Sequence, residues 1–157
     1  MRITLCSIGL TLIFPLAFLS SSVPDTVVLP AAHASASSNA SVINVSDVIP
    51  LAPAHGKAQI KKLALGANAF IGELTIQPGA KVPVHRDPTE EYLYVLSGGG
   101  TMTLNGKVYP VKRGDVVYMP AGAEVSFVNG KEVTKVMQVF AGPGPASKYD
   151  AWQRVTR

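Results

Sequence analysis

From residue 57 onward, short apolar runs alternate with polar residues in a pattern that predicts β-strands. Two early interruptions, Gly66-Ala67-Asn68 and Gln77-Pro78-Gly79, are turn signals between strands. The run at 92–96 reads Tyr-Leu-Tyr-Val-Leu and ends at three consecutive glycines, which free the backbone for a sharp turn. Alternation places Glu91, Leu93 and Val95 on one face of this strand and the tyrosines on the other.

The second half of the chain continues the same pattern. Asn105-Gly106 suits the two positive-φ positions of a type I′ turn, so residues 101–104 and 107–111 are predicted to pair as a hairpin. Further strands are expected at 116–119, 123–128 and 132–140. Strands this short and evenly spaced, with almost no helical periodicity, predict an all-β jelly-roll or barrel of antiparallel strands. Residues 142–157 are a tail in which Trp152 is expected to pack on the barrel or on a partner.

The N-terminal part has a different character. Arg2 precedes an apolar stretch at 3–19, and Ala32-His33-Ala34 fits a small-x-small cleavage site. We interpret residues 1–34 as a signal peptide, which predicts a secreted or periplasmic protein without a stable membrane span after cleavage; an uncleaved anchor is the alternative. Residues 35–56 are expected to be a flexible N-terminal arm, and 57–141 one domain.

Composition narrows the function classes. The one cysteine, Cys6, lies in the apolar stretch, so a cleaved protein has neither a disulfide nor a catalytic thiol. Lys and Arg total 14 against 10 Asp and Glu; removal of Arg2 and Asp25 with the leader leaves the net charge at +4. Because the basic residues are scattered and no aromatic platform lies between them, nucleic-acid binding is not expected.

Two spaced blocks carry a resemblance to a known family. In the first, Gly79, His85, Glu91 and Gly98 stand at the spacing of the first cupin motif, and Asp87 stands where that motif has its second histidine. In the second block, the residues at the spacing of the second cupin motif are Gly114, Pro120, Gly122 and Asn129, and Val125 takes the place of its histidine. The chain therefore resembles a small single-domain cupin, whose fold is a jelly-roll or double-stranded β-helix barrel.

The resemblance implies a site inside the barrel. In cupins, the two histidines and the glutamate of the first motif and the histidine of the second bind one divalent metal, so the corresponding positions are His85, Asp87, Glu91 and Val125. One imidazole and two carboxylates favour Mn²⁺ or Fe²⁺, and Ni²⁺ and Zn²⁺ are further candidates. Both a metal-bound and a metal-free site remain open, because Val125 supplies no ligand.

Other side chains receive structural interpretations. Together with His85, Asp87, Glu91 and Val125, we expect Tyr118 and Phe127 to form the ligand pocket, and Val116 and Met102 to be core or pocket wall. Alternation turns Glu90 and Glu124 outward. Asp115 and Asn129 are expected to be turn residues that bind nearby backbone, and His55 an exposed loop residue.

The sequence thus indicates an exported cupin that binds a small polar ligand or sugar, with or without a weakly held divalent metal. Two other classes remain: a metal-dependent isomerase, lyase or dioxygenase-like enzyme, and a metal-free structural or sensory envelope protein. Substrate identity does not follow from the residues, because one fold hosts many functions. The resemblance and the outward-facing Tyr92 and Tyr94 also predict a homodimer.

Overall fold

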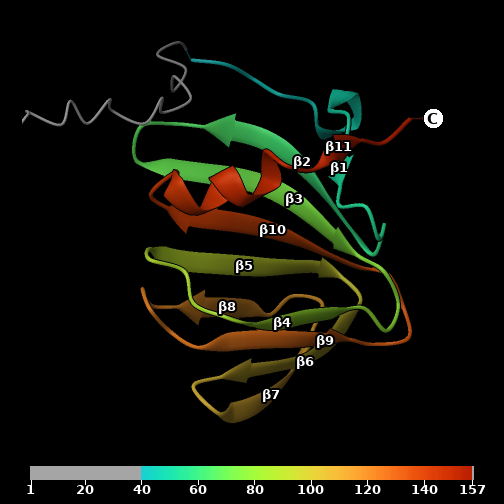
Figure 1. Ribbon diagram of the computed structural model, residues 1–157, viewed down its shortest axis with the longest axis vertical. Helices are drawn as coiled ribbons and strands as arrows, with labels where there is room; N and C mark the ends of the chain where they lie inside the picture. The colour runs from blue at the N-terminus through green and yellow to red at the C-terminus, as the bar shows by residue number, and fades with distance from the viewer. Residues whose placement is uncertain (1–39, 157) are drawn as a thin grey trace, which may run out of the picture. The chain divides into compact units, whose positions relative to one another are not determined.

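A computed structural model describes residues 40–156, which form two antiparallel sheets (Figure 1). The strands of the larger sheet follow one another in the order β11 (Gln153–Arg154), β1 (Leu51–Ala52), β2 (Ala58–Leu65), β3 (Ala69–Ile76), β10 (Thr134–Ala141), β5 (Glu90–Ser97) and β8 (Val116–Met119). Those of the smaller sheet are β4 (Lys81–His85), β9 (Val125–Asn129), β6 (Gly99–Leu104) and β7 (Lys107–Lys112). The predicted all-β jelly-roll of antiparallel strands is therefore confirmed.

The predicted hairpin is the β6–β7 pair. Leu104 lies opposite Lys107, and Asn105 and Gly106 have φ values of 46° and 78°. These are the two positive-φ positions of the expected type I′ turn. The Asn105 side chain also accepts a hydrogen bond of 2.9 Å from the backbone N–H of Glu124, which ties the hairpin to the loop before β9.

The run of glycines after β5 is where the chain passes from one sheet to the other. Gly98 has a φ of 71°, a conformation that glycine adopts without steric cost. At Gly100, a Cβ atom would overlap the carbonyl oxygen of Val128 and the ring of Phe127. The absence of side chains therefore lets β6 lie directly against β9, which closes the smaller sheet.

Two apolar clusters stabilise the barrel. The larger lies between the sheets and contains Leu93, Val95, Met102 and Phe127. The smaller contains Ile60, Phe70, Phe140, Ala146 and Tyr149, and it joins β2, β3 and β10 to the 3₁₀ segment η2 (Gly144–Tyr149). In Figure 1, η2 accordingly lies across the face of the larger sheet.

Three expectations for single residues were wrong. Val116 and Tyr118 are 68% and 48% exposed rather than core or pocket wall. They lie opposite Tyr94 and Tyr92 in the β5–β8 ladder, and residues directly opposite each other share a face, so all four point outward. The prediction for Asn129 was wrong in part: its amide reaches the nearby carbonyl oxygen of Glu132 at 2.9 Å, but the residue is buried, and the amide also lies 3.0 and 2.8 Å from the carbonyl oxygens of Ile76 and Gln77, far away in sequence.

Both ends of the described chain belong to the larger sheet. The 3₁₀ segment η1 (Val45–Asp47) and β1 lie within the predicted N-terminal arm, and β1 pairs with both β2 and β11. The tail forms η2 and β11, and Trp152 packs edge-on against Tyr149 with ring centroids 4.9 Å apart. The predicted signal peptide lies outside the described residues. Within 40–156, no helix has the length and apolar character needed to cross a membrane.

Candidate functional site

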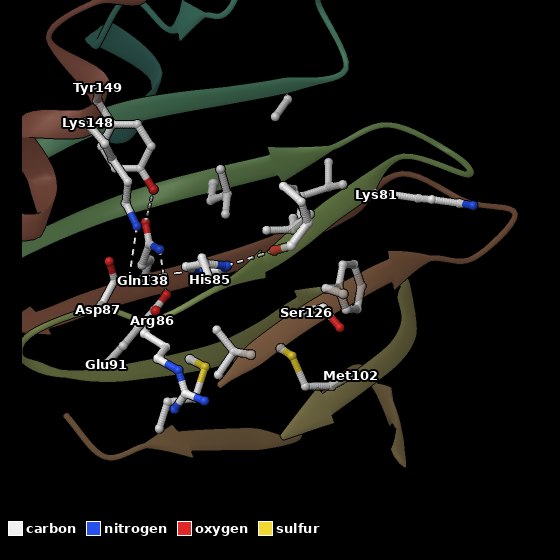
Figure 2. A pocket seen from close by; sticks show the side chains of 18 of the residues that line it. Lys81, His85, Arg86, Asp87, Glu91, Met102, Ser126, Gln138, Lys148 and Tyr149 are labelled. Atoms are coloured by element: carbon white, nitrogen blue, oxygen red, sulfur yellow. Dashed lines mark hydrogen bonds and ion pairs between the residues drawn. The ribbon is translucent and has the colours of Figure 1, made fainter. Parts of the chain in front are cut away.

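A cavity of about 400 Å³ opens between the two sheets (Figure 2). Its walls come from strands of both sheets and from the C-terminal tail, so segments far apart in sequence meet there. Of the expected pocket residues, those that line it are His85, Asp87, Glu91, Val125 and Phe127. The apolar side of the cavity is formed by residues such as Leu74, Ile76, Met102 and Met119.

Tyr118 is the expected pocket residue that lies elsewhere. On the outer face, its hydroxyl donates to Glu90 Oε1 at 3.0 Å, and the Tyr92 hydroxyl donates to Oε2 of the same carboxylate at 2.9 Å. The two rings are 5.2 Å apart. These hydrogen bonds to Glu90 raise the pKa of both tyrosines. Glu90 is therefore the surface carboxylate that the strand alternation predicts.

His85, at the end of β4, is oriented by the backbone. Its Nδ1 lies 2.9 Å from the carbonyl oxygen of Pro83, and a carbonyl oxygen only accepts hydrogen bonds. Nδ1 therefore carries the proton, and in the neutral ring Nε2 presents its lone pair. Nε2 lies 3.8 Å from Asp87 Oδ2. A hydrogen bond of this kind on the remote nitrogen is the usual way in which a metal-binding histidine is oriented.

Glu91 is the buried carboxylate of the site, 5% exposed. Gln138 Nε2 donates to its Oε1 at 2.6 Å, and the Tyr149 hydroxyl donates to Gln138 Oε1 at 2.7 Å. The tyrosine thus orients the amide so that its NH₂ group faces the carboxylate. Burial raises the pKa of Glu91, while the hydrogen bond from Gln138 and the charge of Lys148 oppose that shift. Burial, followed by the charge of Glu91, raises the pKa of Tyr149, which therefore stays a donor.

This raised pKa predicts a pH-dependent stability difference. In the folded, metal-free protein the pKa of Glu91 lies above its usual 4.5. The protonated carboxyl therefore contributes fully to the stability of the fold below about pH 4.5, and this contribution is lost as the pH rises through the pKa of the folded state. We expect Glu91→Gln, which does not ionise, to gain stability relative to wild type as the pH rises. The gain amounts to about 1.4 kcal/mol for each unit of pKa shift.

Urea unfolding of both proteins, with a chelator present and at several pH values from about pH 4 to pH 7, measures this difference. Glu73→Gln is the matched control, because Glu73 lies on β3 in an ion pair with Lys135 and outside the cavity. A stability difference between wild type and Glu91→Gln that stays constant over this range would contradict the prediction.

Asp87 connects His85 to the C-terminal tail. Its Oδ2 accepts a hydrogen bond of 3.0 Å from Lys148 Nζ, and its side chain is only 15% exposed. Sequence reasoning missed Lys148, Gln138 and Tyr149 as site residues. Gln138 could have been found, because a polar residue interrupts the buried alternation of β10. No motif marks the other two.

One donor atom each from His85, Asp87 and Glu91 lie within 4.8 Å of one another, so the structure brings the three predicted ligands together. An imidazole with a free lone pair and two carboxylates fit a divalent cation of the first transition series. The fourth family position is occupied by Val125, which supplies no ligand atom. Val125 is buried and lies opposite His85 in the β4–β9 ladder.

Glu124 and His55 lie near the cavity but outside this donor set. Glu124 is turned outward and forms a 2.8 Å ion pair with Arg86. His55 lines the edge of the cavity in an exposed position, where its Nδ1 accepts a hydrogen bond from the backbone of Lys57. The donor set therefore provides three protein ligands.

Comparisons with known proteins agree with this architecture. Residues 72–140 match the family model of the cupin domain. An uncharacterised protein of Streptomyces coelicolor is 30% identical over 76 residues, which are 48% of this chain and 72% of that protein. The dimethylsulfoniopropionate lyase DddW of Ruegeria pomeroyi is 28% identical over 94 residues, 57% of this chain and 62% of the lyase.

A solved structure extends the similarity to three dimensions. The crystal structure of a predicted oxalate decarboxylase from Thermotoga maritima is 25% identical, with a TM-score of 0.60 over 65% of this chain and 99% of that one. Aligned regions cover 45% to 72% of these curated relatives, and the 62% of the lyase is less than two thirds of its length. The matched domain, the relatives and the shared architecture show that this chain belongs to the cupin family.

Proposed function

We propose that the cavity binds a small organic molecule with an apolar body and one polar end. The observation that carries this proposal is the arrangement of the cavity, in which His85, Asp87 and Glu91 converge against otherwise mostly apolar walls. Small-molecule sites typically combine apolar walls with a few convergent polar groups. Val125 and Phe127 contact the apolar body, while the carboxylates and the imidazole bind hydroxyl or other polar groups of the ligand.

A divalent cation held by His85, Asp87 and Glu91 is part of this proposal. Mn²⁺, Fe²⁺, Ni²⁺ and Zn²⁺ are the candidates. Such an ion would supply Lewis-acid polarisation of a ligand oxygen. The hydrogen bond from His85 Nδ1 to Pro83 keeps Nε2 directed at the two carboxylates, and Gln138 holds one oxygen of Glu91 in place.

Proton-transfer catalysis is the second candidate, favoured by the environment of Glu91. A buried carboxyl group with a raised pKa is suited to accept a proton from a bound ligand and return it, which is the chemistry of lyases and isomerases. One curated relative is named as a lyase, although the match covers only part of it. A metal-free structural or sensory role in the envelope is the outcome if neither ligand nor metal binds.

Elemental analysis of protein purified without chelator or metal affinity resin tests the metal site. We expect about one equivalent of metal in the wild type and its loss in the double variant His85→Ala/Glu91→Gln, because this variant leaves a single donor. The control is His55→Ala/Glu124→Gln, which removes a histidine and a carboxylate outside the donor set. Absence of metal from wild type and control alike would contradict the proposed metal site.

Ligand binding is tested separately by thermal unfolding against a panel of small carboxylic acids and alcohols that have an apolar body, with sugars as its fully polar members. A ligand that binds the folded state at about 100 times its dissociation constant stabilises it by about 2.7 kcal/mol, which raises the midpoint. The same panel applied to Phe127→Ala, which removes an aromatic wall of the cavity, should lose that shift. No shift with any compound would favour the structural role.

Export and dimerisation complete the proposal. The apolar stretch and the small-x-small sequence at 32–34 support secretion or a periplasmic location. Tyr92 and Tyr94 on the outer face, 38% and 48% exposed, support a homodimer interface. A monomeric mass by light scattering would contradict the dimer.

A further inference from the structure

The C-terminal tail places a cation directly at the donor set. Lys148 lies in η2, and its Nζ is 3.0 Å from Asp87 Oδ2, the oxygen that also lies 3.8 Å from His85 Nε2 (Figure 2). The same ammonium group lies 4.6 Å from the centre of the Phe140 ring and 5.8 Å from that of Tyr149. Aromatic faces attract a cation, so the group is held at this point by one carboxylate and two rings.

The charge of the Lys148 ammonium group opposes the binding of a metal cation at the donor set. An ion coordinated by His85 Nε2 and Asp87 would bind the same carboxylate group that already accepts a hydrogen bond from the ammonium group. The side chain of Asp87 is 15% exposed, so solvent and salt screen the repulsion between the two cations only in part. Lys148 also neutralises part of the negative charge that attracts a metal to Asp87 and Glu91.

We propose that Lys148 is a tethered cation that competes with a divalent metal for Asp87, so that metal binding displaces Lys148 and loosens the η2 wall of the pocket. This inference rests on the proposed metal site and adds its regulation. Lys148 has room to leave, because its side chain is already 37% exposed. Its neighbours Tyr149 and Trp152 line the same cavity, so displacement of Lys148 changes the wall that a ligand meets.

The coupling is reciprocal by thermodynamic necessity. The free energy by which a bound metal weakens the Lys148–Asp87 contact is also the free energy by which that contact weakens metal binding, so removal of the Lys148 charge strengthens metal binding. The tail contains the chain's single tryptophan, Trp152, which packs at 4.9 Å on Tyr149, the residue next to Lys148. Its fluorescence therefore reports on the η2 wall without any assay of activity.

Calorimetric titration of the metal-free full chain with Zn²⁺ tests the proposal, because this ion is diamagnetic and does not itself quench tryptophan. We expect Lys148→Met to bind Zn²⁺ at least about tenfold more tightly than wild type, since a hydrogen bond between charged groups no longer has to be broken. In wild type, Zn²⁺ should also change Trp152 fluorescence; in Lys148→Met this change should be small.

Lys62→Met is the matched control. Lys62 also anchors the tail, through a 2.7 Å ion pair with Asp150, but it does not contact the donor set. Equal tightening in Lys62→Met and Lys148→Met would overturn the proposal, because loosening of the tail alone would then explain it. Lys148→Gln repeats the measurement with a second neutral side chain if the methionine variant does not fold.

The outcomes separate this inference from the proposed metal site. If wild type binds Zn²⁺ through His85 and Glu91 but Lys148→Met and Lys148→Gln bind no more tightly, competition by Lys148 is wrong and the metal site stands. If neither wild type nor the Lys148 variants bind Zn²⁺, both are wrong. If Zn²⁺ binds more tightly only in the Lys148 variants, and this gain in affinity is lost when His85→Ala is added, the result supports both the metal site and the competition by Lys148.

Discussion

Replacement of Phe140 by alanine is expected to lower the free energy of unfolding by about 3–5 kcal/mol, the range for truncation of a buried aromatic residue. Phe140 is completely buried, and its ring stacks on Phe70 with centroids 5.8 Å apart. It belongs to the cluster that joins β10 to η2, so the cavity left by the ring lies directly beneath the tail. The loss therefore affects both the sheet and the wall of the site.

Urea unfolding of metal-free wild type and Phe140→Ala measures this effect. Val108→Ala on β7 is the control, since Val108 is 61% exposed and exposed substitutions change the unfolding free energy by less than about 0.5 kcal/mol. Because the Phe140 ring also lies under the Lys148 ammonium group, Trp152 fluorescence should change in Phe140→Ala as well. A destabilisation below about 1 kcal/mol would show that the smaller cluster contributes little to the fold.

Replacement of Asn129 by aspartate is expected to cost about 3–5 kcal/mol, as an uncompensated buried charge does. The Asn129 Nδ2 lies within hydrogen-bonding distance of the carbonyl oxygens of Ile76, Gln77 and Glu132, at 3.0, 2.8 and 2.9 Å. Aspartate replaces the amide nitrogen, which donates, by a carboxylate oxygen, which only accepts, so the three carbonyl oxygens lose their donor. The network also includes Thr134, whose hydroxyl donates to Asn129 Oδ1 at 2.6 Å, so the substitution disturbs the junction of β3, β9 and β10.

Asn68→Asp is the control for this experiment, because Asn68 is exposed in the turn between β2 and β3. Comparison of the two urea midpoints at neutral pH isolates the buried network, since the chemical change is identical. Equal effects of the two substitutions would mean that the three carbonyl groups find other donors, and that Asn129 is not required at the junction.

Much of the fold could be predicted because its signals are local. Asn105-Gly106 specifies a type I′ turn, and the alternation along 91–95 specifies which side chains of β5 face inward. The two motif blocks placed His85 and Glu91 on the inside of the barrel, where the structure has them. Tyr118 was misplaced because the direction of a short strand depends on its register with β5, and this register is a pairing between distant segments.

The barrel and its turns follow from local patterns, because backbone conformation and side-chain alternation depend on neighbouring residues, and the motif spacing identifies the three polar side chains that converge. What surrounds these side chains depends on the packing of distant segments. Lys148 meets Asp87 across 61 positions and Gln138 meets Glu91 across 47. Such contacts depend on how η2 packs against β10 and on which sheet each strand joins. The charge and hydrogen bonding at the site are therefore properties of the folded packing, which no local pattern encodes.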